Sequence, residues 1–153
     1  MNHFRPTVFS LALCAFLAAC GGSDPVGPNH NDDPGDTGTT RVIKANPAFG
    51  ADIVEIFTRR GCTAAGCHGG GAGGMTLTST AATSYASLVG VESPTSGEIR
   101  VIAGDAANSY LVKKLEGTQG AGNGVQMPRT STALDNIDLT NIKNWINTGA
   151  PNN

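Results

Sequence analysis

The sequence predicts a small all-α domain that follows an apolar leader and a polar linker. Four segments between residues 46 and 151 place apolar side chains at helical spacing, and glycine-rich loops separate them. No stretch alternates apolar and polar residues for long enough to predict a sheet. The chain has 153 residues, of which 5% are aromatic and 21 are glycine. Because so few large side chains are available for a core, we expect a disulfide, a metal or a cofactor to staple the domain.

The first 19 residues form an apolar leader that we expect to be removed. Arg5 precedes an uncharged run from Val8 to Ala19, which is shorter than the about 20 residues that a membrane-spanning helix needs. The run ends in Leu17-Ala18-Ala19-Cys20, which resembles the lipobox of bacterial lipoproteins. This resemblance implies cleavage before Cys20 and lipid attachment to it, and hence a membrane partner. An ordinary secretory signal with an incidental cysteine is the alternative.

Residues 20–40 are predicted to be a disordered acidic tether. Positions 21–40 hold five glycines, three prolines and four aspartates but no lysine or arginine. A segment of this composition cannot bury enough apolar surface to order itself. No aspartate follows Cys20 directly, which by the same resemblance favours the cell envelope, with an anchor in the outer membrane that faces the periplasm or the cell surface. His30 lies in the tether and is expected to be solvated.

The domain is expected to span residues 41–153. It holds nine basic and eight acidic residues, whereas positions 21–40 hold acidic ones alone. A nucleic-acid-binding protein needs a strongly basic face, so we expect no nucleic-acid partner.

The first helix is predicted to begin at Asn46 and to end at Gly61. Asn46 is a favourable N-cap, Pro47 suits the first helical position, and glycine commonly follows the last turn. Its apolar residues share one face, and they are Phe49, Ile53, Ile56 and Phe57. A second helix is expected over about residues 79–89, where it carries Tyr85 and Leu88.

Two further helices are predicted toward the end of the domain. The third covers residues 105–116 and has Asp105 as its expected N-cap. The fourth has the clearest signals, because Asp135 is a favourable N-cap and Leu134 and Leu139 occupy the positions of a hydrophobic staple.

Two cysteines and a histidine directly follow the first predicted helix. The motif is Cys62-Thr63-Ala64-Ala65-Gly66-Cys67-His68, with four residues between the cysteines. Two thiols and an imidazole in this order are the chemistry of covalent haem attachment, in which both thiols add to vinyl groups and the histidine becomes the proximal ligand of the iron. The usual spacing is two residues, and the wider spacing resembles that of some multihaem cytochromes.

The other cysteines do not compete for this motif. Cys14 lies in the leader and Cys20 takes the lipid. Cys62 and Cys67 are therefore the remaining thiols, and His68 is the only histidine after residue 40. A Cys62–Cys67 disulfide is the main alternative, because exported proteins form disulfides readily. A structural zinc site would need a fourth ligand from an aspartate, a glutamate or water.

Two methionines are candidates for the second axial position of the iron. Met127 precedes Pro128 on a glycine-rich loop, from which it can reach the face of the ring opposite His68. Met75 lies only seven residues after His68 and is expected to pack at the edge of the ring. An ordinary loop methionine is the alternative for Met127.

Two arginines and a glycine run are further candidates for ligand contacts. Arg100 and Arg129 are candidates to face the haem carboxylates, and solvated surface arginines are the alternative. Residues 69–74 formally match G-x-G-x-x-G. They follow a Cys-His pair and not a strand, so we expect no dinucleotide site there.

Short sequence blocks in a set order point to a known family. The blocks are Cys67-His68-Gly69, Leu77 with Ser84-Tyr85-Ala86-Ser87-Leu88, Arg100-Val101-Ile102-Ala103-Gly104-Asp105 leading to Ser109-Tyr110-Leu111, Met127-Pro128, and Trp145-Ile146 with Gly149-Ala150. In this order they resemble a monohaem cytochrome c domain of the planctomycete type, found also in similar bacterial lipoproteins. The resemblance covers residues 46–151, and its departures are the wide cysteine spacing and Ala106, where the family often has proline.

This resemblance implies a single, covalently bound haem c. It implies Cys62 and Cys67 as thioether anchors. It implies His68 and Met127 as the axial ligands of the iron. Thioether ligation favours reduced iron and raises the reduction potential.

The expected function is the transfer of single electrons between redox partner proteins. A six-coordinate iron has no site for a substrate, so we do not expect an enzyme. The alternatives are a haem c sensor or enzyme with an open or displaceable distal site, and a haem-free binding lipoprotein stapled by a Cys62–Cys67 disulfide. The family resemblance also implies that the first and last helices cross, and we expect Phe57 to contact Trp145 there.

Overall fold

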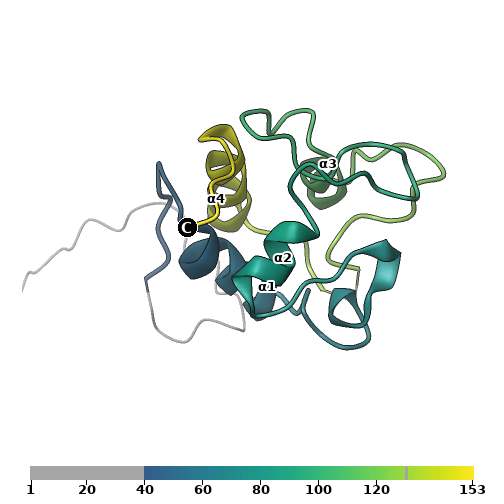
Figure 1. Cartoon of the computed structure of the whole chain (residues 1–153), viewed down its shortest axis with the longest axis horizontal. Coiled ribbons are helices and arrows are strands. Elements are labelled where there is room, and N and C mark those ends of the chain that lie inside the picture. Colours follow the sequence, from purple (N-terminus) through teal and green to yellow (C-terminus); the bar gives the residue numbers. More distant parts are fainter. Residues whose placement is uncertain (1–39, 130) are drawn as a thin grey trace, which may run out of the picture. The chain divides into compact units, whose positions relative to one another are not determined.

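The described part of the chain is helical and contains no strand. The computed structural model describes residues 40–129 and 131–153, so the predicted leader, Cys20, His30 and the tether up to residue 39 lie outside it. Its helices are η1 (Phe49–Ile53), α1 (Val54–Arg59), η2 (His68–Gly70), η3 (Ala72–Gly74), α2 (Ala81–Ala86), α3 (Tyr110–Glu116) and α4 (Asn136–Asn147) (Figure 1). Extended segments there pair only through isolated bridges. This agrees with the predicted all-α class.

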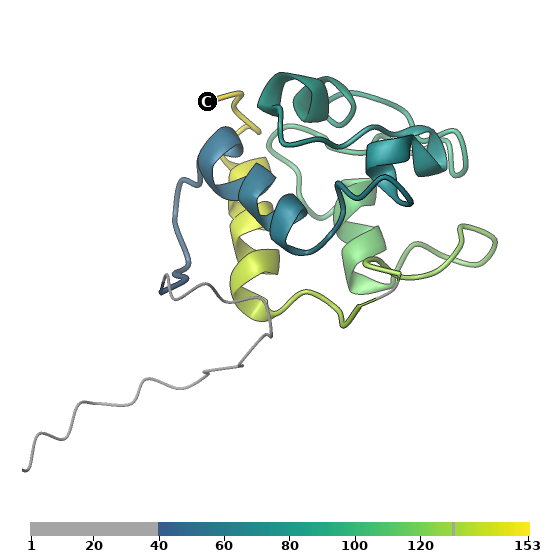
Figure 2. The same cartoon turned by 90° about the horizontal axis from the view of Figure 1, so that it is seen from below.

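The first and last helices of the described residues contact each other. η1 continues directly into α1, and α4 lies beside them (Figure 2). The rings of Phe49 and Trp145 meet there, with centroids 4.8 Å apart. The prediction that Phe57 contacts Trp145 is wrong, because Phe57 lies about two turns further along the helix and lines a cavity instead. Tyr85 of α2 packs edge-on against Phe49, at a centroid distance of 5.3 Å.

The first helix begins at Phe49 and not after Asn46. Asn153 at the C-terminus accepts the first helical amides. Its side-chain oxygen accepts the Phe49 amide at 2.9 Å, and its backbone carbonyl accepts the Gly50 amide at 2.8 Å. Asp52 accepts the Ala48 amide at 2.8 Å. The C-terminal residue thus lies at the start of η1 (Figure 1), and the capping role expected of Asn46 falls to other residues.

The third helix also begins later than predicted, at Tyr110. Asp105, the expected N-cap, closes a turn by accepting the Asn108 amide at 3.1 Å. The first two amides of α3 donate to carbonyls outside the helix. The Tyr110 amide donates to the Ile99 carbonyl at 3.0 Å, and the Leu111 amide donates to the Arg100 carbonyl at 2.9 Å. These bonds place the start of α3 against the segment that carries Arg100.

α4 begins as predicted, with Asp135 as its N-cap. The carboxylate of Asp135 accepts the Asp138 amide at 3.0 Å. Leu134 and Leu139, the predicted staple pair, both pack against the core. Every signal for this helix is local, which is why the sequence predicts it well.

The remaining helices are short. α2 covers only residues 81–86 of the predicted 79–89, because the chain then leaves the helix and the Val101 amide donates to the carbonyl of Leu88 at 3.2 Å. Among the described residues, no helix combines the length and the apolar character needed to cross a membrane.

A buried ion cluster ties the start of the domain to α1 and α4. Asp138 of α4 is 1% exposed, and it accepts from Arg41 at 3.2 Å and from Arg59 of α1 at 2.7 Å. Arg41 also pairs with Asp135 at 2.6 Å. The cluster fixes the point at which the chain enters the domain.

Candidate functional site

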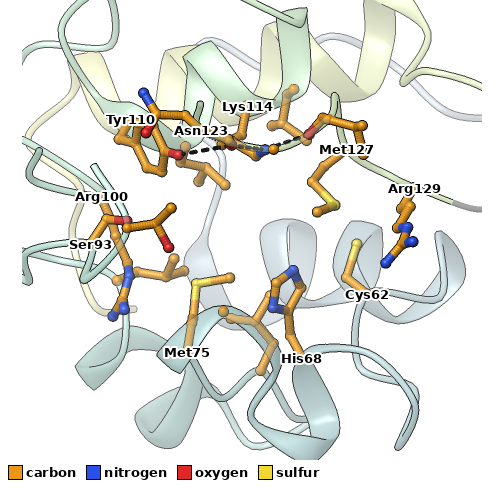
Figure 3. Close-up of a pocket in the computed structure, with 18 of the residues that line it drawn as sticks. Cys62, His68, Met75, Ser93, Arg100, Tyr110, Lys114, Asn123, Met127 and Arg129 are labelled. Carbon is orange, nitrogen blue, oxygen red and sulfur yellow. Dashed lines mark hydrogen bonds between the residues drawn. The ribbon is translucent and has the colours of Figure 1, made fainter. Parts of the chain in front are cut away.

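A cavity of about 460 Å³ lies between α3, the cysteine–histidine loop and the loop that follows α3 (Figure 3). Its apolar wall includes Phe57, Leu77, Leu88, Leu111 and Leu115. The charged side chains that line it are Arg100, Lys114 and Arg129, and no aspartate or glutamate of the described residues does so. Cofactor sites typically have volumes of about 300–1,000 Å³. The cavity therefore suits a cofactor with an apolar body and anionic groups.

The imidazole of His68 points into this cavity (Figure 3). Its Nδ1 lies 2.7 Å from the carbonyl oxygen of Ala72. A carbonyl oxygen only accepts hydrogen bonds, so Nδ1 carries a proton, and in the neutral ring Nε2 keeps a free lone pair. This is the tautomer that a metal ligand needs, and a carbonyl partner on the other ring nitrogen holds the ring in place.

The loop that carries His68 is closed by its own backbone. The His68 amide donates to the Cys62 carbonyl at 3.2 Å, and the His68 carbonyl accepts the Leu77 amide at 3.1 Å. A side chain on Gly69 would place its Cβ 2.1 Å from the Thr63 carbonyl oxygen. The turn between the two cysteines therefore packs so tightly against the residues after His68 that only glycine fits there.

The two cysteines differ in their relation to the cavity. Cys62 lines it, and burial raises the pKa of its thiol to about 11. Cys67 is half-buried and is not among the lining residues. Both are free thiols. The structure thus brings Cys62 and His68 to the same cavity. Cys67 precedes His68 in the sequence but does not line this cavity.

Both candidate methionines reach the cavity, from different sides. Met127 faces His68 across it, whereas Met75 lies on the same side as His68 (Figure 3). The Met127 amide donates to the Lys114 carbonyl at 2.8 Å, which ties its loop to α3. A group bound between His68 and Met127 would have one of the two side chains on each of its faces.

The two candidate arginines lie at opposite ends of the cavity (Figure 3). Arg100 is 6% exposed and donates to the carbonyls of Ser87 and Gly74 at 2.8 and 2.9 Å. No carboxylate of the described residues pairs with it, and burial lowers the pKa of its guanidinium. Arg129 is exposed and lies on the Cys62 side of the cavity (Figure 3). Arg100 is therefore a buried cation at the cavity without an anionic partner from the described chain.

The described residues contain no group of three or more His, Cys, Asp or Glu side chains that could hold a metal ion. A structural zinc site, the minor alternative from the sequence, would need such a group. Haem iron does not, because the porphyrin supplies its four equatorial ligands. No family model, curated protein or solved structure matches the chain.

Two contacts at the site are not predicted by the sequence. The hydrogen-bond partner of His68 is the backbone carbonyl of Ala72, and no pattern of side chains in the sequence predicts this contact. The Nζ of Lys114 donates to the carbonyls of Asn123 and Val125 in the loop that leads to Met127. A lysine near a helix C-terminus is common for reasons of the helix dipole, so its position alone gives no signal of this contact.

Proposed function

We propose that this protein is a monohaem c-type cytochrome that transfers single electrons. The observation that carries the proposal is the pairing of His68 Nδ1 with the Ala72 carbonyl at 2.7 Å, which leaves Nε2 free toward a cavity with Met127 on its far side. When bound there, haem supplies the reversible one-electron chemistry of its iron. The residues of the chain bind it, orient it and keep water away.

His68 and Met127 are the proposed axial ligands. His68 offers a neutral nitrogen whose tautomer is set by the backbone, and Met127 offers a thioether from the opposite side of the cavity. Met75 is the less suitable sixth ligand, because it lies on the same side as His68. If both side chains held the iron, no coordination site would remain for a substrate, so we propose electron transfer and not catalysis.

Cys62 and Cys67 are the proposed covalent anchors. Each thiol adds its sulfur to one carbon of a vinyl group and its hydrogen to the other, so the addition needs no oxidant or further reactant. Cys62 already lines the cavity, whereas Cys67 must turn toward it from its present half-buried position. The four residues between them give the loop the length for such an adjustment.

Arg100 is the proposed partner of the haem carboxylates. The carboxylates of haem leave the ring at the edge opposite its vinyl groups, and Arg100 lies across the cavity from Cys62 (Figure 3). Arg129 lies on the Cys62 side and is assigned no such role. An anion beside Arg100 would also compensate a guanidinium that is now buried without one.

The leader and Cys20 extend the proposal to location. A lipid on Cys20 would hold the domain at a membrane of the cell envelope, proposed to be the outer membrane. Redox proteins of the same compartment would then supply and accept its electrons.

The deciding experiment is the absorption spectrum of the full-length protein exported by a host with c-type maturation genes. We expect a covalent haem in a haem stain, one haem per chain by pyridine haemochrome, and the near-infrared band of methionine-ligated iron. Covalent haem without that band, together with carbon monoxide binding, would favour a sensor or enzyme with an open site. Absence of haem, with a Cys62–Cys67 disulfide by mass, would overturn the proposal in favour of a binding lipoprotein.

A further inference from the structure

We propose that Lys114 is the positioning residue that holds Met127 opposite His68. The inference rests on the proposed function, in which Met127 is the sixth ligand. Lys114 lies in the last turn of α3 and lines the cavity together with Met127. It binds the methionine loop, residues 117–127, with both its backbone and its side chain.

The contacts of Lys114 lie at the end of the loop that carries the ligand. Its backbone carbonyl accepts the Met127 amide at 2.8 Å. Its Nζ donates to the carbonyl of Asn123 at 3.0 Å and to that of Val125. One residue therefore holds three points of the loop within five positions of the chain.

Apart from the contacts of Lys114, neutral hydrogen bonds hold the methionine loop. Four of its residues are glycines at positive φ, at positions 117, 120, 122 and 124, and glycine loses the most conformational freedom on ordering. Val125 is 55% exposed, so it adds little burial. The remaining anchors are neutral bonds, such as that from Gln126 Nε2 to the Leu115 carbonyl at 2.7 Å. Hydrogen bonds from a charged donor are about twice as strong as such neutral ones.

The ammonium of Lys114 has no competing partner among the described carboxylates. The side chain of its neighbour Lys113, by contrast, forms an ion pair with Glu98, and Lys113 meets the loop through its backbone carbonyl, which accepts the Thr118 amide at 2.9 Å. The ammonium groups of the two adjacent lysines of α3 thus have different partners: that of Lys114 binds the loop and that of Lys113 binds Glu98. Lys113 is therefore a matched control for Lys114.

The test compares Lys114→Met with Lys113→Met in the full-length exported protein. Methionine keeps the unbranched apolar stem of lysine and removes its donors. Hydrogen exchange of the backbone amides over 119–127 is the first measurement, with the amides of α4 as an internal reference for the fold. We expect exchange in the loop to accelerate about tenfold or more in Lys114→Met and to stay within about twofold in Lys113→Met. Lys114→Arg, which keeps a cationic donor, should restore much of the protection.

The second measurement reports on the ligand itself. In oxidised Lys114→Met we expect a weaker near-infrared band of methionine-ligated iron and roughly tenfold faster binding of added imidazole, both measured per bound haem. Lys113→Met should match the wild type in both.

The outcomes separate this inference from the proposed function. Haem in the wild type, with an unchanged band and unchanged loop exchange in Lys114→Met, would overturn the positioning role alone. Absence of haem from the wild type would overturn both, since Met127 would then be no ligand. Faster loop exchange with a weakened band in Lys114→Met, restored in Lys114→Arg, supports the inference.

Discussion

The Nδ1 atom of His68 lies 2.7 Å from the carbonyl oxygen of Ala72, four residues later in the chain. Ala72 stands between Gly71 and Gly73, which have φ values of 84° and 70°. Left-handed backbone at both neighbours folds the chain back toward the imidazole, a path that most other residues would resist. The glycine run after the histidine thus lets the backbone accept from His68 and fix the orientation of its ring.

Gly69→Ala is expected to lower the haem content strongly, whereas Gly66→Ala should leave it unchanged. A Cβ at Gly69 would lie 2.1 Å from the Thr63 carbonyl oxygen, so the turn must open and His68 must move. At Gly66 a Cβ meets nothing within 4 Å. Overpacking of this kind costs about 1–3 kcal/mol of unfolding free energy. Pyridine haemochrome per chain and denaturant unfolding of both variants check this, and equal haem in both would show that the turn does not position the histidine.

Met127→Ala is expected to abolish the near-infrared methionine band and to lower the reduction potential. A thioether ligand favours reduced iron, so its loss stabilises the oxidised form. The reduced variant should also bind carbon monoxide stoichiometrically, which the wild type should not. The measurements are a spectroelectrochemical titration and a carbon monoxide difference spectrum.

Met75→Ala is the matched control, because Met75 lines the same cavity from the side of His68. It should keep the band and exclude carbon monoxide. If Met75→Ala lost the band and Met127→Ala kept it, the assignment of the sixth ligand would have to be reversed.

The helices show which parts of the fold the sequence can predict. α4 is predicted well because its N-cap Asp135 and its staple residues lie within a few positions of its start. The start of η1 is mispredicted because its first amide is accepted by Asn153, 104 residues further along the chain. The start of α3 is mispredicted for the same reason, because the amide of Tyr110 donates to the carbonyl of Ile99, which lies outside the helix. Local patterns cannot contain such partners.

The candidate site divides along a similar line. Residue type and spacing suffice to single out Cys62, His68 and Met127, which all line one cavity. The contact of His68 with the Ala72 carbonyl and the hydrogen bonds from Lys114 depend on how the loops fold back on themselves. The sequence pattern predicts neither of them. The contacts that the sequence does not predict at this site are therefore contacts to backbone carbonyls.

Arg100→Met is expected to destabilise the protein by about 1–3 kcal/mol, because it removes two hydrogen bonds from a charged donor to the carbonyls of Ser87 and Gly74. It should also lower the reduction potential, since a nearby positive charge disfavours oxidised iron. Arg129→Met removes an exposed charge and should change the stability by no more than about 0.5 kcal/mol. Urea unfolding and redox titration of both variants test this, and a larger effect at Arg129 would contradict the assignment of the carboxylate end.

Asp135→Asn is expected to flatten the loss of stability in acid. Burial opposes ionisation of Asp135, but hydrogen bonds from the Asp138 amide and the Arg41 guanidinium outweigh it and hold the pKa of this carboxyl below its ordinary value. A carboxyl whose pKa is lowered by folding stabilises the protein above the unfolded value. That stability is lost as the pH falls below about 4 and through the folded pKa. Asparagine remains a good N-cap but does not titrate.

Urea unfolding of the exported protein between about pH 3 and pH 7 measures this effect, because the slope of stability against pH reports the protons bound on unfolding. Asp135→Asn should be about 1 kcal/mol less stable than the wild type at pH 7 and should approach it in acid. Asn136→Ala, at the next position and neutral, should keep the wild-type slope. Parallel curves for the wild type and Asp135→Asn would mean that the pair of Asp135 with Arg41 adds no pH-dependent stability, and that the N-cap bond alone explains the place of this aspartate.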